Sequence, residues 1–336
     1  MAMISLGDMA RHFVAQRDMS QLRGRLALVS QELALNRAVD TTRHLQGRSD
    51  RLVQADAKIA RLGGEVALAE TLAHRLKTGQ TALGQIDSLR NTLSSRLVGV
   101  PISAIEKSLT EAGAMSEGAL RDIFAALSTR HGGDYVFSGR ASDRAPLAPV
   151  DDVLAALRVQ AAGATSVEDL AQVANAFFRD PAGPFVTWVY QGGTGAADSR
   201  DLGEGLQIGM GPRADDPALR DVFVALATGI LVAQSDLPLA GSTRATALQR
   251  VGTALVDAGS GMAAITARLG MNEALVEQVV TLRGANRTAS QIMRNDMVGI
   301  DQAQSASTLQ ELQAQLEIQY TITGRIAALS LAGYLR

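Results

Sequence analysis

Apolar residues recur every three or four positions near both ends of the chain, with polar residues between them. In the C-terminal part, residues 262–331 contain no proline and carry leucines and isoleucines at this spacing. Such spacing places apolar side chains along one side of a helix. It predicts a helix of about 70 residues, roughly 100 Å long at about 1.5 Å per residue. The apolar stripe of this helix comprises Leu309, Leu312, Leu316, Ile322, Ile326 and Leu329.

A helix of that length cannot cover its own stripe, and the N-terminal part of the chain offers a partner. Residues 4–97 are helical in pattern, with a first helix followed by a second over residues 49–98. Pro101 marks the end of the second helix, because proline disfavours helix in the residue before it. The first helix has the three-and-four spacing of a coiled-coil seam, at Met19, Leu22, Leu26, Val29 and Leu33.

The middle of the chain has a different character. Residues 116–130 predict a helix with Ser116 as its N-cap. Residues 131–134 have the composition of a turn and precede a short aromatic and β-branched run. Residues 140–217 hold most of the chain's prolines. From residue 140 onward, the pattern predicts helices at 151–161, 166–178, 218–234 and 243–255. It also predicts a strand at 184–190 and a weaker strand at 206–210.

These elements predict a mainly α fold, an elongated antiparallel helical bundle or coiled coil formed by both termini, with a small α+β insert domain at the distal end. The expected domains are a terminal coiled coil of 1–42 and 300–336, an inner helical rod of 43–142 and 218–299 with a short β-hairpin, and the insert of 143–217. A two-helix pair leaves apolar surface uncovered, so the two terminal stripes predict a polymerisation interface. Packing within one chain would also explain the N-terminal stripe.

Composition and charge exclude several classes of function. A net charge of −2 and a pI of 6.1 give no electrostatic support for binding nucleic acid or an anionic membrane. Apolar runs are too short for a membrane span, and the longest, residues 222–233, is expected to form a buried helix. Cysteine is absent, which excludes disulfides and thiol catalysis. The first residues do not have the pattern of a cleaved signal peptide.

Candidate chemistry is sparse along the sequence. The glycine run at residues 192–195 lacks the lysine of a phosphate-binding loop and is expected to be a tight turn. The acidic pairs at 151–152 and 215–216 suit helix starts better than catalysis. We therefore predict no enzymatic activity, no cofactor and no metal site. The four histidines, expected to lie far apart on solvated faces, are His12, His44, His74 and His131.

Three stretches carry a resemblance to a known family. Residues 133–139 form a turn-and-strand signature through Gly133, Tyr135, Val136, Phe137, Ser138 and Gly139. Residues 16–22 and 309–331, with an apolar tail at Tyr334 and Leu335, are similar to a first and a last helix. Together they resemble the bacterial flagellin family, and most of all its hook-associated proteins at the junction between hook and filament.

The resemblance implies a structural subunit without an active site. Such a subunit is exported by the flagellar type III apparatus, without a cleaved signal peptide, to the extracellular hook–filament junction. It implies, as partners, further copies of the chain, the hook-side hook-associated protein, flagellin and an export chaperone, and it implies neither nucleic acid nor membrane. Two alternatives stay open: a short flagellin that forms the filament itself, and a helical signalling or adaptor rod.

Overall fold

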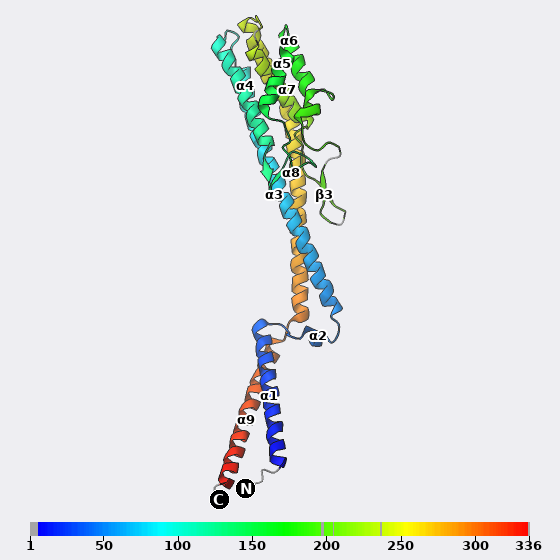
Figure 1. Cartoon of the computed structure of the whole chain (residues 1–336), viewed down its shortest axis with the longest axis vertical. Helices are drawn as coiled ribbons and strands as arrows, with labels where there is room; N and C mark the ends of the chain where they lie inside the picture. Colours follow the sequence, from blue (N-terminus) through cyan, green and yellow to red (C-terminus); the bar gives the residue numbers. More distant parts are fainter. Residues whose placement is uncertain (1–5, 196–197, 204, 236, 335–336) are drawn as a thin grey trace. The chain divides into compact units, whose positions relative to one another are not determined.

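The computed structural model describes residues 6–195, 198–203, 205–235 and 237–334, and within these ranges it describes side chains from residue 13 to residue 325. The fold is mainly α, as the pattern predicts (Figure 1). The helices are α1 (Leu6–Leu35), α2 (Thr41–His44), α3 (Asp50–Val98), α4 (Glu106–Leu127), α5 (Val150–Ala161), α6 (Val167–Phe178), α7 (Pro217–Gln234), α8 (Gly241–Val298) and α9 (Gln302–Tyr334). Between them lie two antiparallel hairpins, β1 (Arg130–His131) with β2 (Asp134–Tyr135), and β3 (Ser199–Asp201) with β4 (Gln207–Gly209).

The chain forms two compact units. The terminal unit comprises Met1–Gly63 and Gly284–Arg336, and the central unit comprises Gly64–Arg283. The boundary between the units falls inside α3 and α8. The sequence-based division at residues 42, 142, 217 and 299 stays a prediction. Within the central unit, α5 and α6 of the expected insert pack against α7.

The expected unbroken helix over residues 262–331 is wrong, because it ends at Val298 and a new helix begins at Gln302. Asp301 starts α9: its carboxylate Oδ1 accepts the Gln304 amide at 3.0 Å, and its carbonyl accepts the Ser305 amide. An aspartate that accepts amides in this way is a helix start. Toward the N-terminus, the separate helix expected at 243–255 is instead continuous with the rest of α8.

Three glycines make that continuity hard to read from sequence, since glycine often marks a break. In α8 they serve close packing instead. A Cβ built on Gly252 would lie 2.7 Å from the Val98 amide nitrogen, and one on Gly261 would lie 2.9 Å from the Ala218 Cβ. Gly259 leaves room for the buried guanidinium of Arg90.

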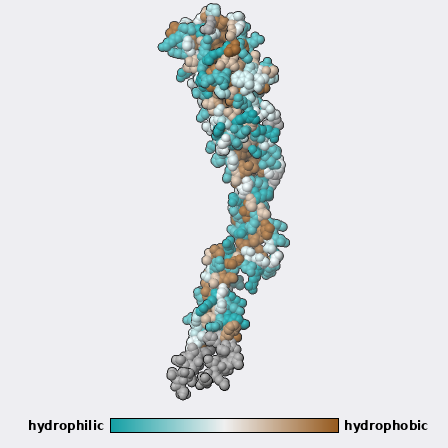
Figure 2. Space-filling view, viewed as in Figure 1, coloured by the Kyte–Doolittle hydropathy of each residue, from teal (hydrophilic) through white to brown (hydrophobic). Residues whose placement is uncertain are grey.

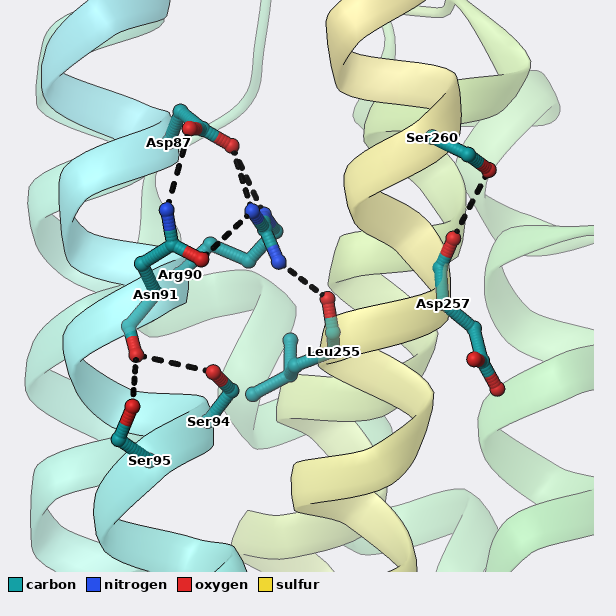
Figure 3. Close-up of polar contacts among 8 residues, drawn as sticks. All are labelled: Asp87, Arg90, Asn91, Ser94, Ser95, Leu255, Asp257 and Ser260. Atoms are coloured by element: carbon teal, nitrogen blue, oxygen red, sulfur yellow. Dashed lines mark hydrogen bonds and ion pairs between the residues drawn. The ribbon is translucent and has the colours of Figure 1, made fainter.

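Arg90 joins α3 to α8 in the central unit (Figure 3). Its Nη1 donates to the Leu255 carbonyl oxygen of α8 at 2.6 Å, and its Nε donates to the Asp87 carboxylate of α3 at 2.9 Å. The charge of Arg90 is thus paired while the group lies between two helices, which a buried cation requires. Further along the same helix pair, Arg283 and Glu65 form a second ion pair.

Helices α4 and α7 pack closely and in opposite directions. Gly113 faces Ala233, and Gly229 faces Ser116, so positions rise on one helix as they fall on the other. Ser116 was expected to cap this helix, and that expectation is wrong, because α4 begins ten residues earlier at Glu106. Ser116 lies mid-helix and fully buried, and its hydroxyl donates to the Ala112 carbonyl oxygen at 3.0 Å.

A cluster of aromatic rings forms the core around α7. Phe223 of α7 lies with its ring centroid 5.4 Å from that of Phe124 and 5.8 Å from that of Phe185. The strand expected at 184–190 is wrong: Phe185–Val189 forms a π-helical turn that buries both of its ends. Pro184 adopts the helical conformation, and β pairing is confined to an isolated antiparallel bridge between Tyr190 and Leu147 at the end of the apolar run. The weaker strand at 206–210 is confirmed as β4.

Helix α7 is long and apolar enough, by length and composition, to cross a membrane, and 72% of that stretch is buried inside the structure. Burial of this extent is that of a core helix. The N-cap expected at Ser166 is confirmed, because Ser166 and Asp169 form a capping box at the start of α6.

Candidate assembly surface and signature turn

The two ends of the chain pair with each other in the terminal unit. Helices α1 and α9 lie side by side (Figure 1). They run in opposite directions, since Arg23 contacts Tyr320 while Ala38, which follows α1, donates its amide to the carbonyl oxygen of Val298, which precedes α9. The Arg23 Nη2 donates to the Tyr320 hydroxyl at 2.5 Å, and the guanidinium carbon lies 5.5 Å from the ring centroid.

The sequence-predicted stripes meet along this helix pair. Leu312 and Leu316 of α9 are buried, and Leu309 is half-buried. Ile322 is 46% exposed and therefore lies outside the seam. Ile326 and Leu329 belong to the backbone of α9, but their side chains lie outside the described ones. The half-buried stripe residues of α1 are Met19, Leu22, Leu26, Val29 and Leu33.

A second set of apolar residues on the same two helices faces solvent, and of these the sequence pattern singled out Ile322 alone, as part of the stripe. On α1 it includes Val14, Leu28 and Leu35, which are separated by multiples of seven residues. On α9 it includes Ile318 and Ile322, four residues apart. A search for a second heptad stripe on each helix would have found them. Figure 2 shows this kind of surface, with apolar patches among polar ones over α1 and α9.

The signature segment begins as a two-residue hairpin loop. Gly132 and Gly133 have φ angles of 61° and 96°, and His131 pairs with Asp134 on either side of them. Two successive residues with positive φ define a type I′ turn, which only glycine and a few polar residues adopt at low cost. Tyr135 stacks with Arg130, whose guanidinium carbon lies 4.1 Å from the ring centroid.

The rest of the signature connects segments that are far apart in sequence. Val136, Phe137 and Ser138 are buried. The Phe137 carbonyl oxygen accepts the Ala214 amide at 3.0 Å, and the Ser138 carbonyl oxygen accepts the Gly193 amide at 2.8 Å. Gly139 has a φ of 59°, and a Cβ there would lie 2.9 Å from the Arg213 Cδ. The signature is therefore a structural element whose backbone holds residues 193 and 214 beside it.

Two buried ionisable groups flank the signature. Arg75 of α3 donates to the carbonyl oxygens of Tyr135 and Val136 at 3.2 and 3.3 Å, and burial lowers its pKa. The Tyr190 hydroxyl donates to the Gly193 carbonyl oxygen at 3.1 Å. Burial, with a further contribution from Asp215, raises the Tyr190 pKa to about 12. Both polar groups of the Gly193 backbone are therefore hydrogen-bonded within the chain, which fits the tight turn expected for the glycine run.

The candidate chemical residues have structural roles. Asp151 lies in the first turn of α5 and pairs with Arg121 at 2.7 Å, while Asp216 caps α7. The histidines are not all far apart, since the rings of His74 and His131 stack with centroids 6.5 Å apart. Among the residues that the structure describes, no three potential metal ligands come together.

The fold and surface define a mainly α protein whose two ends pair with each other and present apolar side chains to solvent. No family model and no curated protein matches the sequence. Among solved structures, the chain is similar to a protein from Vibrio parahaemolyticus assigned as a flagellar hook-associated protein. That likeness has a TM-score of 0.51 at 12% sequence identity and covers 74% of this chain and 96% of the other. FlgL of Bacillus cereus aligns with a TM-score of 0.45 at 14% identity, over 73% of this chain and 99% of the other. At such identity the Vibrio likeness shows a common fold.

Proposed function

We propose that this chain is a non-enzymatic structural subunit of a bacterial flagellum, placed extracellularly at the junction between hook and filament. Its partners there are further copies of itself, the hook-side hook-associated protein and flagellin. Export through the flagellar type III apparatus, with a dedicated chaperone, is part of the proposal. The signature at residues 133–139 favours the junction over the filament, and the fold in common with the Vibrio protein supports the flagellar assignment.

One observation carries this proposal: the paired ends of the chain leave large apolar side chains uncovered. The seam between α1 and α9 covers one side of each helix, whereas Leu28, Leu35 and Ile318 remain exposed. Burying a leucine or isoleucine side chain fully stabilises a contact by about 1.5–3 kcal/mol before ordering costs. Several such residues on each copy provide enough free energy for neighbouring copies to associate. The proposed polymerisation interface therefore consists of the predicted stripes together with this second set.

The test is a deletion of the gene in its own bacterium. Loss of a junction subunit leaves hooks without filaments and releases unpolymerised flagellin into the medium, and the intact gene restores filaments. Filaments of normal number and length on the deletion strain would refute the proposal. Counting copies per flagellum separates the alternatives: one ring's worth fits a junction subunit, thousands fit a short flagellin, and an intracellular dimer fits a signalling rod.

A further inference from the structure

An open groove runs between α3 and α4 in the central unit. It has a volume of about 980 Å³ and extends along α3 from Thr81 to Arg96. Its lining is unusually uncharged, since Arg96 and Asp122 are its two charged residues. Most of the other side chains that line it are small or carry hydroxyls, among them Ser88, Thr92, Ala119, Ala125, Ala126 and Thr129.

Two glycines in this lining have no role in the packing of a single copy. Around a Cβ built on Gly84 of α3, or on Gly118 of α4, no neighbouring heavy atom lies within 4 Å. Glycine in a helix interior destabilises the helix relative to alanine, so its presence there calls for a structural explanation. For Gly113 in the same helix the reason is the close contact with Ala233. Gly84 and Gly118 instead leave the groove without side chains at these two positions.

A ridge of large apolar side chains lies on α8 of the same unit. Met271, Leu275 and Leu282 are 61%, 45% and 59% exposed. Their spacing of four and seven residues places them on one face of the helix, with Gln278 between Leu275 and Leu282. Val276 and Val279, which face the core, are buried. The ridge is therefore surplus to the packing of one copy.

We propose that the ridge of one copy docks into the α3–α4 groove of a neighbouring copy. This rests on the proposed function, because it requires copies to lie side by side. The two surfaces match in shape, because the large side chains of the ridge would meet the small side chains of the groove. Both surfaces also carry few charged residues, as the cores of protein interfaces do. They also match in length, roughly 22 Å of groove against roughly 17 Å of ridge at about 1.5 Å per residue.

The ridge and the groove are different surfaces of the same chain, so their contact is heterologous. A heterologous contact repeats from copy to copy, and it closes into a ring or continues as a helical array according to the rotation between neighbours. Both outcomes fit a subunit of a tubular assembly. A symmetric dimer would instead place like surfaces against each other.

Cysteine crosslinking tests the pairing cleanly, because the chain contains no cysteine of its own. Gly118→Cys and Leu275→Cys are made in separate copies, which are mixed as concentrated purified protein and also produced together in the deletion strain. A mild oxidant should then give a dimer in the mixture and none with either variant alone. Same-variant dimers, or no mixed dimer in either preparation, would overturn the docking. The control is Val159→Cys on α5, which is 76% exposed and lies outside both surfaces, so it should give no mixed dimer with either variant.

A second variant separates docking from folding. Gly118→Leu adds bulk to the open groove, where a Cβ meets no heavy atom within 4 Å, so its thermal midpoint should equal or exceed that of the parent while assembly falls at least tenfold. Val159→Gln serves as the control and should assemble normally. Normal assembly of Gly118→Leu would refute the docking. If mixed dimers form with purified protein but the deletion strain makes normal filaments, the docking stands and the flagellar role fails.

Discussion

Arg23 of α1 and Tyr320 of α9 contact each other across the two ends of the chain, 297 positions apart in sequence. The contact combines two hydrogen bonds to one hydroxyl with a guanidinium above the ring. Apolar stripes that repeat regularly permit more than one register, and a polar contact that only one register satisfies selects it. This pair therefore fixes how α1 and α9 align.

The first prediction measures that pair. A double-mutant cycle with Arg23→Ala and Tyr320→Ala should give a coupling free energy of about 0.5–1 kcal/mol, the range for an exposed cation–π contact. Denaturation followed by far-UV circular dichroism provides the measurement. Tyr320→Phe keeps the ring and loses the hydrogen bonds, so it should retain part of the coupling. A coupling of zero would show that the two side chains do not act together.

The second prediction distinguishes the outer apolar residues of the terminal unit from those in its seam. Leu28→Asp with Ile318→Asp should change the stability of the isolated protein by less than about 1 kcal/mol, because both side chains are exposed. The same pair should abolish filament growth in the complemented deletion strain. Leu26→Asp with Leu316→Asp, in the seam, should reduce helix content as well as assembly. Normal filaments from the outer pair would mean that this surface is not used.

The third prediction compares two glycines in one helix. Gly113→Ala should destabilise the protein by about 1–3 kcal/mol, because the new Cβ would lie 2.2 Å from that of Ala233 and α4 and α7 must move apart. Gly118→Ala, five residues further along α4, meets open space and should stabilise by up to about 1 kcal/mol. Chemical denaturation measures both. Equal effects would contradict the close contact of α4 with α7.

The fourth prediction concerns the signature turn. Gly139→Ala must adopt a φ of 59° and also meets Arg213, so it should cost about 1–2 kcal/mol from the left-handed backbone alone. Gly163→Ala is the control, because its Cβ would meet no neighbour. Thermal unfolding checks both. A neutral Gly139→Ala would show that the segment tolerates a different backbone.

The fifth prediction is a pH dependence at the start of α6. Hydrogen bonds from the side chain and backbone of Thr165, then from Ser166, lower the Asp169 pKa from 3.8 to about 2. A lowered carboxyl pKa stabilises the folded state above the unfolded value, so that contribution is lost as pH falls from about 4 to about 2. Asp169→Asn should flatten the stability profile in this window. Ser166→Ala removes the cap and one of the hydrogen bonds that lower the Asp169 pKa, so it should cost about 1 kcal/mol and reduce the slope only in part, because the Thr165 hydrogen bonds remain.

Much of the helical framework follows from the sequence, because periodicity and caps are local signals. The bounds of α3, α5, α6 and α7 lie within one residue or so of expectation, and the seam of α1 meets that of α9 as its spacing implies. The errors arose where distant contacts decide the local structure. The Phe185–Val189 turn packs Phe185 on Phe223, and α4 begins ten residues before Ser116, in a stretch where Gly113 lies against Ala233 of α7.

The glycines of α8 carry a consequence for tracing the ancestry of this chain. At Gly252 and Gly261, any side chain would collide with a neighbouring helix, so substitution there is costly whatever happens elsewhere. Distant homologues whose overall similarity has eroded are therefore expected to retain glycine at these two places, nine residues apart, where Val98 and Ala218 approach the α8 backbone. A search restricted to that sparse steric pattern should find kin that whole-sequence comparison misses.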